Sequence, residues 1–243
     1  MTLIITSTVY VNSDLTVVTD PGLREQQYID SILFYIGSAG TKKIVVCDNS
    51  GFDYSKIERL PAQAKQHGKE IEFLSFQGDK DKIKQRGKGY GEGEIMEYTF
   101  RNSRLLGKES DFFKVTGRVL VLNIDSISSK VTPGEACFQK VTMNPFSTLH
   151  KFKVDTRLYY CSRAFFERNL LDAYKTVDDN GGRYLEHAYY DSLLANKARW
   201  TRFKVFPRYS GISGSTGLSY SKPLWIWWIQ SIVYQTIFLR QDS

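Results

Sequence analysis

The chain has 243 residues, with 33 lysines and arginines against 26 aspartates and glutamates, so its formal net charge is +7. Hydrophobic residues make up 42% and charged residues 24%, a globular composition that excludes wholesale disorder, collagen and coiled coil. This length suits one large α/β domain or two small ones. The cysteines Cys47, Cys137 and Cys161 form no close pairs. Their spacing excludes a disulfide framework or a four-cysteine zinc site and favours a reducing compartment.

The first third of the sequence alternates between strand and helix signals. It begins MTLIITSTVYV, which lacks the basic start and long apolar run of a signal peptide and indicates a first strand in a cytosolic protein. We expect strands at Leu3–Val11, Lys43–Asp48 and Ile71–Phe76, and helices at Pro21–Ile36 and Tyr54–His67. This β-α-β-α-β order predicts a mostly parallel, doubly wound sheet. Ligands bind at the carboxyl ends of such strands, which makes Thr6 and Asp48 candidate ligand contacts.

A glycine-rich stretch, Gly87–Glu94, is predicted to form a turn before a helix near Ile95–Leu106. Glycines let backbone amides approach a phosphate, and Lys88 would add charge; the alternative is a plain loop before the helix. The stretch matches neither the P-loop nor the dinucleotide fingerprint. The elements expected afterwards are a strand at Asp111–Asn123, a loop-dominated insertion at 125–150, a strand at Arg157–Tyr160, helices at Ser162–Tyr174 and Tyr184–Ala195, and a short strand at Phe203–Pro207.

The sequence Lys114-Val-Thr116-Gly117-Arg118 lies within the predicted strand 111–123. Side chains two residues apart share one face of a strand, so Lys114 and Thr116 should point the same way. Gly117 interrupts the strand and lets Arg118 turn toward a ligand. Two cations beside a hydroxyl suit a diphosphate, because both stabilise charge on a leaving phosphate. A solvated edge strand is the alternative.

This arrangement resembles a known family. Three β-α units, then the helix sequence YTFRNSRLL and the strand sequence DFFKVTGR, resemble GT-A nucleotide-sugar glycosyltransferases over roughly residues 1–210, particularly bacterial enzymes that build lipopolysaccharide O-antigen or capsule. In many of these enzymes an Arg-Asn pair precedes a strand that ends in a metal-binding Asp-x-Asp. Arg101 and Asn102 stand where that pair would, but the strand carries Lys-Val-Thr-Gly-Arg. This departure from the family's motif favours a metal-independent enzyme, with Mn²⁺ or Mg²⁺ at Asp125 or Asp155 as the alternative.

The family resemblance also suggests which residues carry the chemistry. Inverting GT-A enzymes place a catalytic base at the start of a late helix, where this chain has Glu186, and His187 beside it is a candidate acceptor contact. Aromatic neighbours would raise the pKa of Glu186 toward a useful value. Asp155 is assigned to sugar or acceptor recognition and Arg157 to donor binding, with a structural Asp–Arg pair as the alternative.

The loop Pro207–Gly217, which includes Ser213, Gly214 and Ser215, resembles the mobile segment that closes over the donor in such enzymes. Closure would exclude water that otherwise hydrolyses the donor. A plain linker to the following segment is the alternative reading, since serine and glycine content does not separate the two.

The C-terminal segment is apolar and rich in tryptophan, so we divide the chain into a GT-A-like catalytic domain (1–220) and a C-terminal helix (221–243). Its apolar stretch is shorter than the roughly 20 residues that span a bilayer. Trp225, Trp227 and Trp228, with flanking cations, instead suit the headgroup region of an anionic membrane. A core helix or a subunit interface in a homo-oligomer are the alternatives.

Together these features predict a hexosyltransferase. The expected donor is a nucleotide diphosphate sugar, most naturally UDP-linked, and the expected acceptor is a polyprenol- or other lipid-linked glycan at the inner face of the cytoplasmic membrane. One rival is a sugar-nucleotide nucleotidyltransferase, although Ser7–Ser13 lacks the glycine signature that it needs. The other is a non-catalytic membrane- or nucleic-acid-binding module. The basic residues are dispersed rather than massed, so nucleic acid is not an expected partner.

Overall fold

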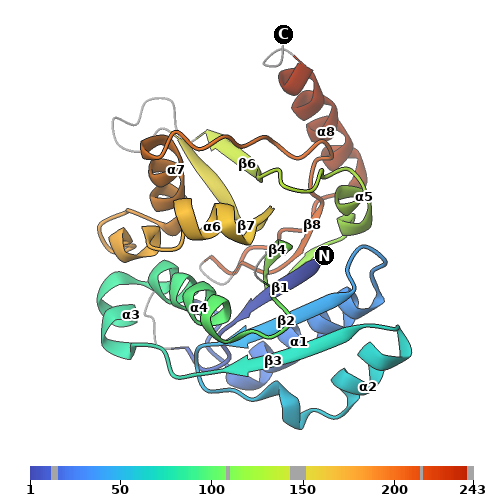
Figure 1. Ribbon diagram of the computed structural model, residues 1–243, viewed down its shortest axis with the longest axis vertical. Coiled ribbons are helices and arrows are strands. Elements are labelled where there is room, and N and C mark those ends of the chain that lie inside the picture. The colour runs from blue at the N-terminus through green and yellow to red at the C-terminus, as the bar shows by residue number, and fades with distance from the viewer. Residues whose placement is uncertain (12–15, 108–109, 143–151, 214–215, 240–243) are drawn as a thin grey trace.

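Six strands form one mixed sheet (Figure 1). The computed structural model describes residues 1–11, 16–107, 110–142, 152–213 and 216–239. In order across the sheet the strands are β3 (Glu70–Ser75), β2 (Lys43–Asp48), β1 (Thr2–Ser7), β4 (Asp111–Thr116), β7 (Phe152–Ser162) and β6 (Cys137–Thr142). The first four strands run parallel, and β7 is antiparallel to both β4 and β6. The predicted α/β fold with a mostly parallel sheet is confirmed.

Helices cover both faces of this sheet and produce two core clusters. The helices are α1 (Pro21–Gly37) and α2 (Arg59–Gln66) on one face, and α4 (Lys88–Asn102), α6 (Arg163–Asn169) and α7 (Leu185–Ala195) on the other. Successive side chains of β1 point to opposite faces, so Leu3 and Ile5 join the first cluster and Ile4 joins the second. Burial on both faces explains why β1 is an almost continuous apolar run.

Helix α1 begins at its predicted residue for a local reason. The Asp20 side chain accepts a hydrogen bond from the Leu23 amide at 2.6 Å, and Pro21 occupies the first helical position, where its missing N–H costs nothing. The buried face of the helix carries Tyr28, Ile32 and Tyr35, spaced by three or four residues.

The prediction of a turn over the glycine-rich stretch is wrong, because α4 begins at Lys88 and contains Gly89, Gly91 and Gly93. Their small size serves close packing instead. A Cβ on Gly93 would lie 2.0 Å from the Cβ of Tyr174, so only glycine lets α4 approach that side chain. Tyr174 belongs to η2 (Ala173–Thr176), a short helix between α6 and α7.

Several element boundaries also differ from expectation. The helix expected over 54–67 is divided into η1 (Tyr54–Lys56) and α2. The insertion expected to be mostly loop contains α5 (Ile124–Ser128) and β6, and residues 143–150 of it lie outside the described part. A further helix, α3 (Lys80–Arg86), precedes α4.

A small second sheet pairs β5 (Val119–Val121) with β8 (Tyr209–Gly211). The short strand predicted at 203–207 is wrong, since the strand lies at β8 instead. After β8 the chain doubles back, with Ile212 bridging to Ser219 and the Tyr220 amide donating to the Gly211 carbonyl. We call residues 209–220 the hairpin segment; it leads directly to the last helix.

The last helix, α8 (Leu224–Leu239), lies against residues 203–208 by one side only (Figure 1). The Tyr234 hydroxyl donates to the Phe203 carbonyl at 2.8 Å, and the Tyr234 ring packs on Phe206. Neither core cluster of the described residues includes a residue of α8. Within the described residues, no helix combines the length and apolarity needed to cross a membrane. The predicted boundary near residue 220 stays a prediction.

Candidate functional site

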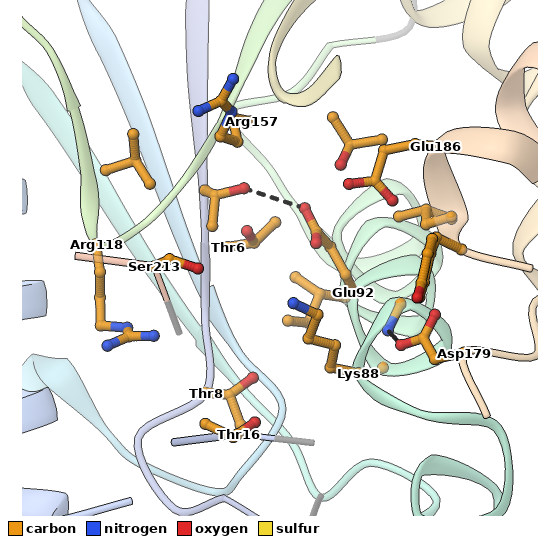
Figure 2. Close-up of a pocket in the computed structure, with 18 of the residues that line it drawn as sticks. Thr6, Thr8, Thr16, Lys88, Glu92, Arg118, Arg157, Asp179, Glu186 and Ser213 are labelled. Carbon is orange, nitrogen blue, oxygen red and sulfur yellow. Dashed lines mark hydrogen bonds between the residues drawn. The ribbon is translucent and has the colours of Figure 1, made fainter. Parts of the chain in front are cut away.

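A cavity of about 690 Å³ opens at the carboxyl ends of β1 and β4. Its walls come from the first turn of α4, the middle of β7, the first turn of α7 and the hairpin segment. Figure 2 shows Glu92 near the centre, Arg118 and Ser213 on one side, and Glu186 and Asp179 on the other. The topology thus gathers segments from most of the chain at the sheet edge where parallel strands bind ligands.

Most of the predicted site residues meet in this cavity. Those that line it are Thr6, Lys88, Thr116, Arg118, Asp155, Arg157, Glu186 and Ser213. Four others do not line it: Asp48, Lys114, Asp125 and His187. Gly214 and Ser215 lie outside the described residues.

Asp48 is buried and does not face the cavity, because its carboxylate binds other groups of the protein. Its carboxylate accepts hydrogen bonds from the Ser7 hydroxyl at 2.7 Å, from the Val9 amide at 3.1 Å, and from the amide and hydroxyl of Ser50 at 2.7 and 2.6 Å. These bonds fix the turn that follows β1. Asp48 thus shapes the loop beside the cavity, and a contact with the donor stays a prediction.

Lys114 is also buried, with only 1% of its side chain exposed. The predicted common direction of Lys114 and Thr116 is confirmed, because the ammonium donates to the Thr116 hydroxyl at 3.0 Å. It also donates to the Glu92 carboxylate and to the Thr156 carbonyl. An ammonium has three N–H donors, and all three are used. In this arrangement the ammonium of Lys114 therefore has no N–H left to donate to a diphosphate.

Arg118 does face the cavity, for the reason predicted. A Cβ on Gly117 would lie 2.4 Å from the Thr6 carbonyl, so glycine is required where β4 ends beside β1. The chain then turns, and the Arg118 guanidinium lies over the Tyr28 ring and donates to the Gln27 side chain at 2.9 Å. These contacts hold the cation at the cavity wall.

Asp155 and Arg157 form a bidentate ion pair on β7. The guanidinium donates from Nε and Nη2 to the two carboxylate oxygens, with the Nη2 contact at 2.5 Å. Its faces lie over the rings of Tyr209 and Tyr220, at 4.1 and 4.8 Å from their centroids. The pair therefore both lines the cavity and holds the hairpin segment in place.

Glu186 occupies the first turn of α7 and faces the cavity (Figure 2). Burial raises its pKa, and the neighbouring carboxylates of Glu92 and Asp155 raise it further, whereas Lys153 lowers it. A carboxyl whose pKa is raised is suited to exchange protons near neutral pH.

Asp179 caps helix α4 from a distant segment of the chain. Its carboxylate accepts the Gly89 amide at 2.9 Å, in the first turn of α4, where helix N–H groups have no internal partner. Burial nevertheless raises the pKa of Asp179 to about 6, and the charges of Glu186 and Glu92 add to this effect.

His187 is buried beneath the cavity wall instead of lining it. Its Nδ1 accepts the Tyr184 amide at 3.2 Å, and the His187 amide donates to the Tyr184 carbonyl at 3.0 Å. These two bonds fix the start of α7, the turn that carries Glu186. A contact between His187 and the acceptor stays a prediction.

The predicted metal ligands do not fit a divalent ion. Asp125 lies on α5 and accepts the Gly40 amide at 2.8 Å, away from the cavity-lining residues. Asp155 is committed to Arg157. Across the described ranges, no group of three or more His, Cys, Asp or Glu side chains is arranged to hold a metal. Hard cations need several oxygen ligands, and these two carboxylates are not brought together.

Sequence reasoning missed several residues that line the cavity. They are Arg24, Tyr28, Glu92, Lys153 and Asp179. Glu92 lies in the glycine-rich stretch, where the sequence alone does not show that its carboxylate reaches a cavity. Asp179 stands in a turn sequence, and only its long-range bond to α4 reveals its position.

Helix α8 presents a second surface of interest, with six exposed apolar side chains among those that the structure describes. These are Leu224, Trp225, Trp228, Ile229, Ile232 and Val233. We call this set the exposed face of α8. The Arg208 guanidinium lies over the Trp227 ring, so this tryptophan is not part of the exposed face.

No protein-family model matches this sequence, and a search of curated proteins likewise found no match. The function therefore has to come from the residues of the cavity and of the exposed face of α8.

Proposed function

We propose that this chain is a glycosyltransferase that moves a hexose from a nucleotide diphosphate donor, UDP-linked in the first instance, to a lipid-linked glycan. The observation that carries the proposal is one cavity with two chemically different ends. Arg118 and the hydroxyls of Thr8 and Ser213 lie at one end, and Glu186, whose pKa is raised, lies at the other. This pairing suits a transfer reaction in which phosphate leaves and a hydroxyl attacks.

The diphosphate would lie toward Arg118. Its guanidinium can donate to phosphate oxygens while its face stays on Tyr28. Ser213, in the hairpin segment, adds a hydroxyl donor at this end of the cavity. The Thr8 hydroxyl, just after β1, also lines this end, but it donates to the Asn49 side chain at 2.6 Å. The leaving nucleoside diphosphate carries the charge that develops as the glycosidic bond breaks, and these donors stabilise it.

Glu186 would take the proton of the acceptor hydroxyl. Removing that proton makes the oxygen a better nucleophile toward the anomeric carbon, and a base with a pKa nearer neutrality does this more efficiently. Lys153 on β7 faces the same carboxyl and stabilises its ionised form. The chemistry proposed requires no metal, and no step is assigned to one.

The acceptor would be presented at a membrane, in the synthesis of O-antigen or capsule at the cytoplasmic face. The exposed face of α8 supports this part of the proposal, because tryptophan and aliphatic side chains suit the interfacial region of a bilayer. Lys222 at the start of the helix and Lys204 beside its packed side are exposed cations that would face anionic headgroups.

A panel of nucleotides and nucleotide sugars, tested by thermal shift with and without Mn²⁺, examines this proposal. A ligand at 100 times its dissociation constant stabilises the folded state by about 2.7 kcal/mol, so a true donor should raise the melting temperature clearly. The stabilising sugar nucleotide should then release its nucleoside diphosphate when a polyprenyl-linked acceptor is added. Absence of any shift across the panel would contradict the proposal, and salt-dependent RNA or DNA binding would replace it.

A further inference from the structure

Glu92 stands near the centre of the cavity (Figure 2). Its carboxylate forms an ion pair with the buried Lys114. The exposed fraction is 22% for the Glu92 side chain and 1% for that of Lys114. The Lys114 ammonium donates to Glu92, to the Thr116 hydroxyl and to the Thr156 carbonyl, so its three donors are satisfied within the protein. Lys114 can therefore act on a ligand only through Glu92.

The two oxygens of Glu92 have different surroundings. The hydrogen bonds it accepts from described residues, those of Lys114 and Thr116, both reach Oε1. The carboxyl group points into the cavity, between Thr6 and Glu186 (Figure 2). One oxygen thus anchors the side chain, and the other is placed to accept hydrogen bonds from a ligand.

Burying the ion pair of Glu92 and Lys114 costs free energy. Taking each charge out of water costs several kcal/mol, and well-packed apolar side chains of similar volume are often as stable. The N–H donors of Lys114 do not reach the cavity. The role left to Lys114 is to keep the Glu92 carboxylate charged and fixed in position. An anionic oxygen in that position attracts hydroxyl hydrogens and repels phosphate.

Glu92 therefore divides the cavity by chemistry. Phosphate is favoured at the far side, where Arg118 and the hydroxyl of Ser213 lie, and disfavoured beside Glu92. Between Glu92 and Glu186, hydroxyl groups have two carboxyl groups to bind. Cations on this side also lie near carboxylates: Arg157 pairs with Asp155, the charge of Lys153 acts on Glu186, and that of Lys88 acts on Asp179.

We propose that Glu92 accepts hydrogen bonds from hydroxyls of the transferred sugar, and that Lys114 is its positioning residue. The inference rests on the proposed function and sharpens it, because it orients the donor with its diphosphate toward Arg118 and its sugar toward α4. Glu92 contributes to binding of the sugar and little to binding of the nucleotide.

Calorimetric titration with UDP alone, and with UDP-glucose, UDP-galactose and UDP-N-acetylglucosamine, tests this division. The variants are Glu92→Gln, Lys114→Met and, as a matched control, Glu70→Gln at an exposed position on β3. Loss of a hydrogen bond to a charged group should weaken the tightest-binding UDP-sugar about 10-fold or more in Glu92→Gln. Affinity for UDP alone should stay within about twofold, as for independent sites. Lys114→Met should show the same pattern, and Glu70→Gln should change neither affinity.

The outcomes separate the two proposals. If the wild-type protein binds none of the four ligands, the UDP-dependent function fails and this inference fails with it. If it binds them and Glu92→Gln weakens UDP and UDP-sugar equally, or weakens neither, the sugar-binding role of Glu92 is wrong while the proposed function stands. Should Lys114→Met fail to fold, Glu92→Gln alone decides the matter, since it preserves side-chain size and a hydrogen-bond acceptor.

Discussion

The guanidinium of Arg157 lies over the ring of Tyr220, 4.8 Å from its centroid, and so joins the central sheet to the segment that leads into α8. The guanidinium also lies over the ring of Tyr209, and it forms the ion pair with Asp155. Because the hairpin segment supplies Ser213 and Tyr220 to the cavity wall, this single side chain determines how that wall is placed.

Replacing Arg157 should lower the free energy of unfolding more than replacing Tyr220. Tyr220→Ala removes one cation–π contact, which contributes about 1–2 kcal/mol when partly desolvated. Arg157→Ala also leaves Asp155, which is 4% exposed, without its cation, and breaking a buried pair in this way costs about 3–5 kcal/mol. Urea denaturation should show this order in the free energy of unfolding.

The exposed Tyr10→Ala variant is the matched control for Tyr220→Ala. Limited proteolysis should cut the hairpin segment faster in both Arg157→Ala and Tyr220→Ala than in the control. Equal stability of Arg157→Ala and Tyr10→Ala would mean that the contacts of Arg157 with the two tyrosine rings do not hold the hairpin segment in place.

Asp179 should make the stability of the protein depend on pH. Its pKa is about 6 in the folded state against an ordinary value of 3.8, with burial as the main cause, so the folded state holds this proton more tightly than the unfolded chain. Its contribution to stability is therefore complete below about pH 4 and is lost as pH rises through about 6.

The variant Asp179→Asn cannot ionise, yet it keeps an oxygen that can accept the Gly89 amide. Relative to this variant, the wild type should lose on the order of 2 kcal/mol of stability between pH 4 and pH 7. Urea denaturation at both pH values measures the difference. Parallel behaviour of the two proteins would show that Asp179 is ionised throughout this range.

The strands of the sheet can be predicted from the sequence because each strand is marked by its own residues. Apolar runs such as Leu3–Ile5 and 43–48 mark buried parallel strands, and Asp20 with Pro21 marks the start of α1. The prediction of a turn over the glycine-rich stretch was wrong because glycine permits both a turn and close helix packing. Only the position of Tyr174 decides between the two.

The site was predictable only in part, for a related reason. Residues at strand ends, such as Thr6 and Arg118, line the cavity because the topology of a parallel sheet places them there. Whether a charged side chain faces the ligand or a buried partner depends on residues far away in the chain. Lys114 faces Glu92, 22 positions earlier, and Asp179 caps an amide 90 positions earlier.

Glu186→Gln should fold normally and lose most transfer activity. Removing a general base typically lowers the rate by about 10²–10⁴-fold, while donor affinity should be largely kept. Single-turnover transfer and calorimetry on the same preparation measure the two quantities. Turnover close to that of the wild type, with the fold intact, would reduce Glu186 to an ordinary residue of the first turn of α7.

Arg118→Ala should weaken binding of the nucleoside diphosphate itself, in contrast to Glu92→Gln. A charge-assisted hydrogen bond is worth about 1.5–3 kcal/mol, which corresponds to a loss of roughly 10- to 100-fold in UDP affinity. Arg101→Ala, at an exposed arginine near the end of α4, is the matched control. Unchanged UDP affinity in Arg118→Ala would remove the diphosphate from this side of the cavity.

Removing residues 222–243 should leave a folded protein that keeps donor binding, because in the described part of the chain α8 belongs to neither core cluster. The truncated protein should no longer sediment with anionic liposomes. It should lose transfer to lipid-linked acceptors more than transfer to short soluble ones. Unfolding or aggregation of the truncated protein would instead make α8 part of the core.

A finer test of the last helix uses its two sides. Trp225 and Trp228 are 65% and 62% exposed, whereas Trp227 packs over Arg208. Trp225→Ser with Trp228→Ser removes apolar area only from the exposed face, so liposome binding should fall steeply while the melting temperature hardly changes. Trp227→Phe, on the packed side, should keep liposome binding. If the wild type ignores liposomes and forms a dimer that the double variant splits, the exposed face of α8 is a subunit interface and the membrane role is wrong.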